Sequence, residues 1–134
     1  MMNDTNNSNI TRAVVPDSDR SDIPARLFGL HFPLRLEPAI YGITQCIAEE
    51  YAGGYWHFYS LSNGGFYMAP GANQPFSVSC MNYWQGQLSA DALGIVSCLT
   101  AYSHLSFGED GEFPAVCARH YYLLREYMLE HAEV

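Results

Sequence analysis

The sequence predicts an α+β domain in which about three to four helices pack on a small antiparallel meander sheet of three to four strands. Three observations lead to this prediction. Residues 54–70 have the pattern of a β-hairpin, residues 37–51 have the spacing of an amphipathic helix, and two further helical patterns follow residue 89. Because the strands follow one another through short connections, we expect them to be antiparallel.

The hairpin is the clearest local signal. Two aromatic runs flank the segment 62–65, which contains Asn63-Gly64. Asn-Gly is the strongest short-range indication of a hairpin turn, because both residues tolerate positive φ and the turn then matches the twist of the strands. Pro70 ends the second strand, since proline lacks the N–H that a strand ladder needs.

The segments on either side of the hairpin follow from hydrophobic spacing. Residues 14–36 contain several prolines and glycines among scattered apolar residues, which predicts an extended segment or one short helix. Glu37 and Pro38 suit the start of the next helix, and Gly53-Gly54 suits the chain beyond its end. Its apolar residues recur at helical spacing: Leu36, Ile40, Ile43, Ile47 and Tyr51.

The second half of the chain predicts two more strands and two more helices. Residues 76–81 alternate between apolar and polar, and residues 83–88 add a short fourth strand. Ser89 suits an N-cap, so a helix is expected over 90–104; it is apolar nearly all round, which predicts a central position. A final helix is expected over 114–131.

Length and composition predict one compact domain. The chain has 134 residues, of which 49% are apolar, and at this size roughly two thirds of the surface of the unfolded chain can be buried. The first residues are rich in Asn and Ser and offer little to bury. We therefore expect a disordered arm over 1–13, followed by a single domain over 14–134, as a monomer or weak homodimer.

The charge is strongly one-sided. The chain has fourteen acidic residues and six basic ones, all of them Arg, and its net charge is −8. Phosphate contacts need a basic surface, so this balance argues against direct nucleic-acid binding and against an anionic membrane. It favours a basic protein partner, or it serves solubility alone.

The cysteines and the N-terminus predict a cytoplasmic protein. Cys46, Cys80, Cys98 and Cys117 are widely spaced, and no apolar segment resembles a signal peptide. We expect the thiols to be reduced and mostly buried. The longest apolar stretch, over 92–102, is shorter than the roughly 20 residues that a membrane span needs.

Several blocks of sequence resemble one known family. Residues 53–70 read GGYWHFYSLSNGGFYMAP, a distinctive string. Downstream come LSADALGI over 88–95, YSH over 102–104 and HYYLLREY over 120–127. Upstream lie Val15-Pro16, Arg20, Pro24 and Phe28-Gly29. In this order, from about residue 14 to the end, the blocks resemble the antirestriction proteins of the ArdB/KlcA family, which conjugative plasmids and other mobile elements carry.

The resemblance implies a function but no active site. It implies a protein that blocks host type I restriction enzymes, by direct or indirect contact with the restriction machinery. No catalytic residue carries over from the family, so we expect no catalysis, no cofactor and no metal. A regulatory protein of plasmid maintenance is a different class of answer.

One pair of residues allows an enzymatic alternative. Cys117 and His120 lie three residues apart on a predicted helix and therefore share a face. Zinc would need two more ligands, for which Cys98 and His104 are available. A Cys–His nucleophile would need a polar cleft and a third orienting group. A buried Cys and a His at the edge of the core are the simpler interpretation.

Two kinds of residue are candidates for partner binding. The acidic ones form a loop group and a helical stripe: Glu109, Asp110 and Glu112, then Glu126, Glu130 and Glu133. Such rows could also imitate DNA phosphates, although the acid count is modest for mimicry of a long duplex. The hairpin aromatics are the other candidates: Tyr55, Trp56 and Tyr59. Solvation of the acids and core packing of the aromatics are the simpler interpretations.

Overall fold

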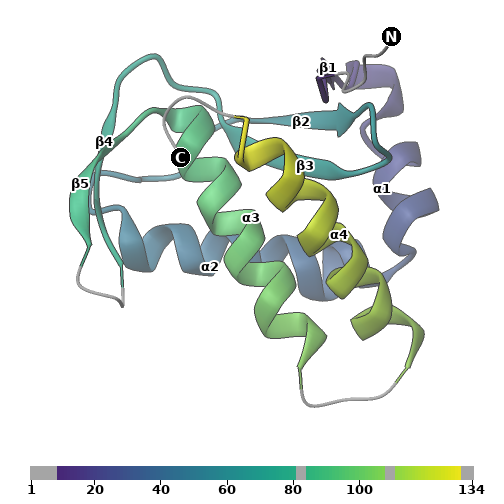
Figure 1. Ribbon diagram of the computed structural model, residues 1–134. Helices are drawn as coiled ribbons and strands as arrows, with labels where there is room; N and C mark the ends of the chain where they lie inside the picture. Colours follow the sequence, from purple (N-terminus) through teal and green to yellow (C-terminus); the bar gives the residue numbers. More distant parts are fainter. Residues whose placement is uncertain (1–8, 81–83, 108–110, 131–134) are drawn as a thin grey trace, which may run out of the picture.

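The computed structural model describes residues 9–80, 84–107 and 111–130 (Figure 1). Strand β1 (Arg12–Val14), the 3₁₀ turn η1 (Asp17–Asp19), helix α1 (Asp22–Phe28), the π-helical turn η2 (Phe32–Leu36) and helix α2 (Glu37–Ile47) come first. Strands β2 (Trp56–Leu61), β3 (Phe66–Pro70), β4 (Phe76–Ser79) and β5 (Gln85–Leu88) follow. Helices α3 (Ala90–Ser106) and α4 (Glu112–Met128) complete the order.

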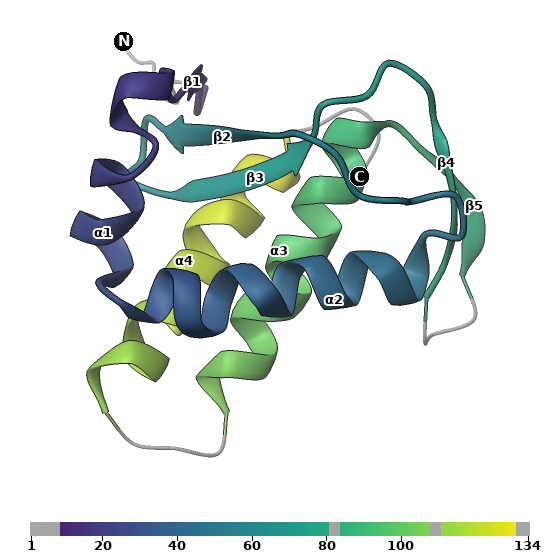
Figure 2. The ribbon, with the colours of Figure 1, turned by 180° about the vertical axis from the view of Figure 1, so that it is seen from behind.

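The α+β class and the antiparallel strand pairing are confirmed, but the strands divide into two sheets instead of one meander. One sheet has the order β1-β2-β3 and the other consists of β4 and β5. Helices α3 and α4 lie side by side against the hairpin, and α2 crosses α3 (Figures 1 and 2). The small sheet lies at one end of α2 and α1 at the other.

The end of α2 explains why the small sheet is separate. We expected this helix to reach residue 51, but it ends at Ile47. Ala48 is extended and forms an isolated antiparallel bridge with Val78 of β4. This bridge pairs the chain just after α2 with β4, so β4 is attached to the end of α2 and not to β3.

The N-terminal third contains more regular structure than expected. Residues 14–36 were expected to be extended or to form one short helix, yet they contain η1, α1 and η2. The expected disordered arm over 1–13 overlaps β1, because Arg12 and Ala13 pair with Leu61 and Ser60. Residues 1–8 lie outside the described part of the chain.

The predicted hairpin turn is confirmed at residues 62–65. Gly64 has a φ of 93°, a conformation that glycine adopts without strain. The Asn63 side chain accepts a hydrogen bond from the Gly65 N–H at 3.0 Å and donates one to the Leu123 carbonyl oxygen of α4 at 2.9 Å. Asn63 therefore shapes the turn and also attaches the hairpin to α4.

Helix α3 is the central element, as its apolar sequence predicts. The Ser89 hydroxyl accepts a hydrogen bond from the Ala92 N–H at 3.1 Å, which confirms the N-cap. Further along the helix, the Tyr102 hydroxyl donates to the Phe66 carbonyl oxygen of β3 at 2.7 Å. The Tyr102 side chain thus ties α3 directly to the hairpin.

Gly94 sets the distance between α3 and β3. A Cβ atom at this position would lie 2.4 Å from the Met68 carbonyl oxygen and 2.4 Å from the Ala69 Cβ. Neither neighbour can move without moving the strand, because one is backbone and the other is a fixed methyl group. Helix and strand therefore approach more closely than any residue larger than glycine allows.

His120 is an unusual member of the core. Its ring is fully buried, and neither ring nitrogen has a hydrogen-bond partner among the described residues. It lies against Phe28, with ring centroids 4.8 Å apart, and against Tyr102 at 5.7 Å. Burial, with a smaller contribution from Arg119, lowers the pKa of His120 to about 4, so the ring is neutral at neutral pH.

Within the described ranges, every helix is too short or too polar to cross a bilayer.

We predict that Gly94→Ala lowers the free energy of unfolding by about 2 kcal/mol or more, because the added methyl group overpacks the α3–β3 contact. The matched control is Gly42→Ala in α2. A Cβ at Gly42 meets nothing within 4 Å, so this change should raise stability by about 0.5–1 kcal/mol through helix propensity. Urea unfolding measures both. Equal effects of the two substitutions would contradict the close packing.

A second prediction concerns the stability of the protein at acidic pH. Because the folded pKa of His120 lies below its unfolded value of about 6.5, the unfolded chain binds more protons between pH 6.5 and 4. Above pH 6.5 the titration of His120 therefore does not lower the free energy of unfolding. As the pH drops from 6.5 to 4, it lowers that free energy by about 3 kcal/mol.

The measurement is the stability difference between wild type and His120→Leu as a function of pH. The variant should gain on the wild type as the pH falls from 6.5 to 4, since leucine does not titrate. His104→Leu, which removes an exposed histidine of α3, is the control. A difference that stays constant over this range would show that His120 is not held neutral by burial.

Candidate functional site

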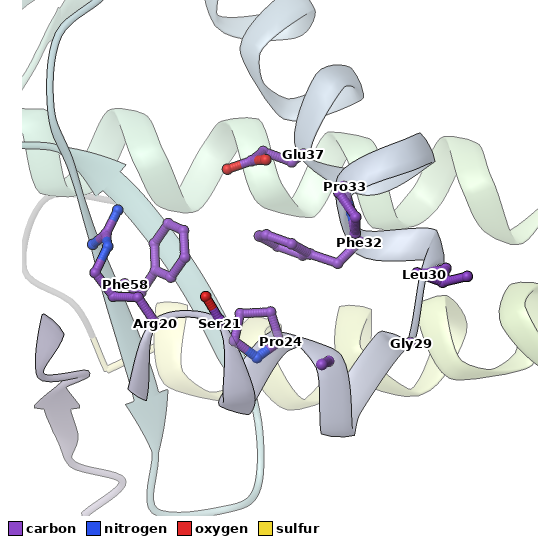
Figure 3. Close-up of a pocket in the computed structure, with 10 residues that line it drawn as sticks. Arg20, Ser21, Pro24, Gly29, Leu30, Phe32, Pro33, Glu37 and Phe58 are labelled. Atoms are coloured by element: carbon purple, nitrogen blue, oxygen red, sulfur yellow. The ribbon is translucent and has the colours of Figure 1, made fainter. Parts of the chain in front are cut away.

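An apolar pocket of about 570 Å³ lies between α1, η2 and β2 (Figure 3). Its floor consists of Pro24, Phe32 and Phe58, all buried. Its remaining walls combine exposed apolar residues with three polar ones: Ala25, Gly29, Leu30 and Pro33, then Arg20, Ser21 and Glu37. A volume of this size is typical of sites that hold a small ligand or a protruding side chain.

The turn between α1 and η2 creates this pocket. Gly29 has a φ of 63° and ends α1, with its N–H donating to the Ala25 carbonyl oxygen at 2.9 Å. The chain then enters η2, where Pro33 occupies the first turn. This change of direction places Phe32 opposite Pro24, with Phe58 of β2 beside them (Figure 3).

Arg20 forms one polar side of the pocket and is held in place by β2. Its guanidinium donates to the Trp56 carbonyl oxygen at 2.8 Å. It also lies 4.0 Å from the centroid of the Phe58 ring and 4.7 Å from that of Tyr55. Tyr55 in turn donates to Asp17 at 3.1 Å. The Arg20 charge is therefore engaged by aromatic faces and a backbone carbonyl.

Glu37 forms the other polar side. It is half-buried, and its carboxylate accepts a hydrogen bond from the Tyr41 hydroxyl at 3.0 Å. Burial, and then Glu37, raise the pKa of Tyr41, so that hydroxyl keeps its proton and remains a donor. Within the described residues no Arg or His lies in ion-pair contact with Glu37. Among the described residues, the Glu37 carboxylate therefore forms no ion pair, although the Arg20 charge acts on its hydrogen-bond partner Tyr41.

A second polar cluster anchors β1 to α3. Asp91, in the first turn of α3, accepts from the Tyr67 hydroxyl at 2.6 Å and forms an ion pair with Arg12. Arg12 also donates to the Tyr67 hydroxyl at 2.7 Å and lies 4.3 Å from the centroid of the Tyr59 ring. These contacts join the edge strand to the helix, so their role is structural.

The structure divides the acidic candidates among different places. Glu112 begins α4 and Glu126 lies near its end, about 21 Å away at 1.5 Å per residue. Glu130 follows the helix and accepts a hydrogen bond from the Ile10 N–H at 3.1 Å. Glu109, Asp110 and Glu133 lie outside the described residues. Glu126 and Glu130 are four residues apart at the end of α4, and both are exposed, whereas Glu112 lies at the other end of the helix.

The hairpin aromatics differ in accessibility. Tyr55 is 55% exposed, whereas Trp56 is 2% and Tyr59 is 8% exposed. The Trp56 indole donates to the Tyr51 hydroxyl at 3.0 Å, and the Tyr59 ring stacks on Tyr67 with centroids 4.9 Å apart. Trp56 and Tyr59 therefore pack in the core, and of the three only Tyr55 is accessible at the surface.

The environment of Cys117 and His120 is the opposite of a nucleophilic site. Both side chains are fully buried, and burial raises the pKa of the Cys117 thiol to about 11. A nucleophilic cysteine needs an accessible thiolate, which means a lowered pKa. Cys98 is buried while His104 is exposed, and the described residues contain no group of three potential metal ligands.

Sequence reasoning did not single out the pocket. Arg20 and Pro24 entered only through the family resemblance, and Glu37 only as the start of a helix. The available signal was Gly29 between Phe28 and Phe32, since a glycine between two aromatic residues in a helical pattern indicates a sharp turn.

Comparison with known proteins identifies relatives along nearly the whole chain. The uncharacterized protein YafX of Escherichia coli strain K12 is 42% identical over 129 residues, which cover 92% of this chain and 82% of YafX. The antirestriction protein KlcA of Escherichia coli is 34% identical over 131 residues, which cover 96% of this chain and 92% of KlcA.

Fold and family model agree with these relatives. A solved structure from work on KlcA and ArdB matches with a TM-score of 0.87 and 34% identity, covering 98% of this chain and 93% of the other. That work describes a novel fold and antirestriction activity against type I DNA restriction systems in vivo but not in vitro. The family model "Antirestriction protein" matches residues 49–134. The chain therefore belongs to the antirestriction protein family, with the KlcA/ArdB fold.

Proposed function

We propose that this protein protects incoming mobile-element DNA from host type I restriction enzymes through protein contact and without catalysis. The observation that carries the proposal is the match to the KlcA/ArdB fold over 98% of the chain at a TM-score of 0.87. Similarity over the full length, at 34% identity, supports a shared mode of action more strongly than one shared motif would.

The relatives also suggest that a further cellular component takes part. The activity of KlcA and ArdB against type I systems is described as present in vivo and absent in vitro. An inhibitor that simply occupied the restriction enzyme would act in a purified reaction as well. We therefore propose that this chain acts through a cellular component that a purified restriction reaction lacks.

Charge supports protein contact over contact with DNA. A net charge of −8 opposes the approach of phosphates, which a DNA-binding surface must attract. Mimicry of duplex DNA would need a long row of carboxylates, and the fourteen acidic residues of the whole chain are a modest number for that. The exposed acids are better suited to rim contacts with a basic protein, which act mainly on association rate and choice of partner.

The buried thiols support a mechanism without covalent chemistry. Burial raises the pKa of Cys98 to about 12 and that of Cys117 to about 11, so both thiols remain protonated at neutral pH. The neutral His120 ring packs between aromatic rings and has no acid to activate it among the described residues. These properties favour a core role for the three side chains.

We predict that expressing this chain raises the plating efficiency of unmodified phage severalfold or more on a host with an active type I system. The same protein, added to purified restriction enzyme and unmodified DNA, should leave the cleavage rate unchanged. The reason is that the cellular component is missing from the second reaction.

The control is an isogenic host without the restriction system, in which expression should not alter plating. Unchanged plating on the restricting host, with the protein soluble and folded, would refute the proposed function. Inhibition of the purified enzyme would refute the need for a further component.

A further inference from the structure

We propose that the pocket between α1, η2 and β2 receives one large apolar side chain of a partner polypeptide. A Lys or Arg of the same partner segment pairs with Glu37. This inference rests on the proposed function, because it assigns the surface through which the protein contact is made. It goes beyond that function by naming the anchor and its flanking charge.

The floor of the pocket suits an aromatic or branched aliphatic anchor. Pro24, Phe32 and Phe58 supply three rigid apolar surfaces from three different elements. The Phe32 and Phe58 rings are themselves fixed, packing edge to face with centroids 5.7 Å apart. A rigid pocket loses little conformational entropy on binding, so the free energy gained by burying the anchor is offset less by ordering of the protein.

Apolar surface continues outside the pocket. Leu30, at the end of the pocket opposite Arg20, is 77% exposed, and Leu34 is 71% exposed (Figure 3). The Leu34 N–H donates to the Leu30 carbonyl oxygen at 3.2 Å, so the two residues lie one helical turn apart. A pocket bordered by exposed leucines fits an anchor side chain on an extended partner surface better than a small free ligand.

The two polar walls carry opposite charges, and the wall formed by Glu37 favours a cation. Arg20 is occupied by the Trp56 carbonyl oxygen and two aromatic rings. Glu37 is half-buried and without a cationic partner among the described residues. A partly buried carboxylate is less screened than one on an open surface, so a Lys or Arg beside the anchor gains from pairing there. The excess of acid over the whole chain, a net charge of −8, attracts the same kind of partner.

The test in cells uses a substitution that fills the pocket. Ala25 is an exposed residue of α1 that lines the pocket, so Ala25→Phe should obstruct the pocket while sparing the core. The matched control is Ala115→Phe, an exposed alanine of α4 away from the pocket. We expect Ala25→Phe to lose most of the protection in the phage assay and Ala115→Phe to keep it, with both variants melting close to the wild type.

The test in solution uses two capped dipeptides as probes, acetyl-Trp-Arg-amide and acetyl-Trp-Glu-amide. Titration into isotopically labelled protein, followed by two-dimensional NMR, locates each probe and measures its affinity. Both should shift the amides of Ser21 and Ala25, and the Arg probe should bind about threefold more tightly, the size of a partly exposed ion pair. Glu37→Gln should abolish this preference, whereas Glu49→Gln, an exposed control with the same charge change, should retain it.

The results can distinguish a failure of the proposed function from a failure of the pocket inference. If the wild type gives no protection in cells, the proposed function is wrong, and the probe titration still decides whether the pocket binds an apolar side chain beside a cation. If the wild type protects but Ala25→Phe protects equally well, the pocket is not the contact surface. Probe shifts elsewhere on the protein, no shifts at all, or equal affinity for the two probes would also overturn the inference.

Discussion

The contact between α3 and β3 is the constraint on which the rest of the structure depends. At Gly94 the helix lies against the strand so closely that a Cβ would come within 2.4 Å of the Met68 carbonyl oxygen. The Tyr102 hydroxyl and the Cys98 thiol add polar contacts to the Phe66 and Met68 backbone. Because α2 and α4 both pack on α3, the position of this helix fixes every other layer (Figures 1 and 2).

The pocket is a consequence of this arrangement. With α3 fixed on the hairpin, α2 crosses α3 and η2 precedes α2, and Phe32 of η2 packs against Phe58 of β2. The chain changes direction between α1 and η2 at Gly29, whose φ of 63° is favourable for glycine. The pocket is the space between α1, η2 and Phe58. Arg20, which precedes α1, and Glu37, which follows η2, form its charged walls. Its geometry is therefore as rigid as the packing that surrounds it.

Local patterns explain which parts of the fold the sequence could predict. The turn at Asn63-Gly64, the Ser89 cap and the apolar spacing of α3 each act over a few residues, so they appear in the sequence. The end of α2 at Ile47 and the separation of β4 from β3 depend on the bridge between Ala48 and Val78, thirty residues apart. Such a contact leaves no local signal.

The same distinction applies to the candidate site. The acidic residues and the hairpin aromatics stand out in the sequence, yet Trp56 and Tyr59 are buried. Conversely, nothing in the sequence brings Arg20, Phe58 and Glu37 together, because their proximity arises from the packing of α1, η2 and β2. That His120 finds no hydrogen-bond partner among the described residues could not be foreseen either, since a helical stripe does not show whether a polar ring finds a partner.

Native-state hydrogen exchange tests the central position of the α3–β3 contact most directly. The amides of Ile95 and Cys98 in α3, and of Met68 in β3, should exchange only through global unfolding, with opening free energies equal to the unfolding free energy. The amides of β4 and β5 should open at a lower free energy, because these four-residue strands form a separate sheet with partly exposed residues. If the amides of α3 exchanged at a lower free energy than those of β4 and β5, α3 could not be the element that holds the fold together.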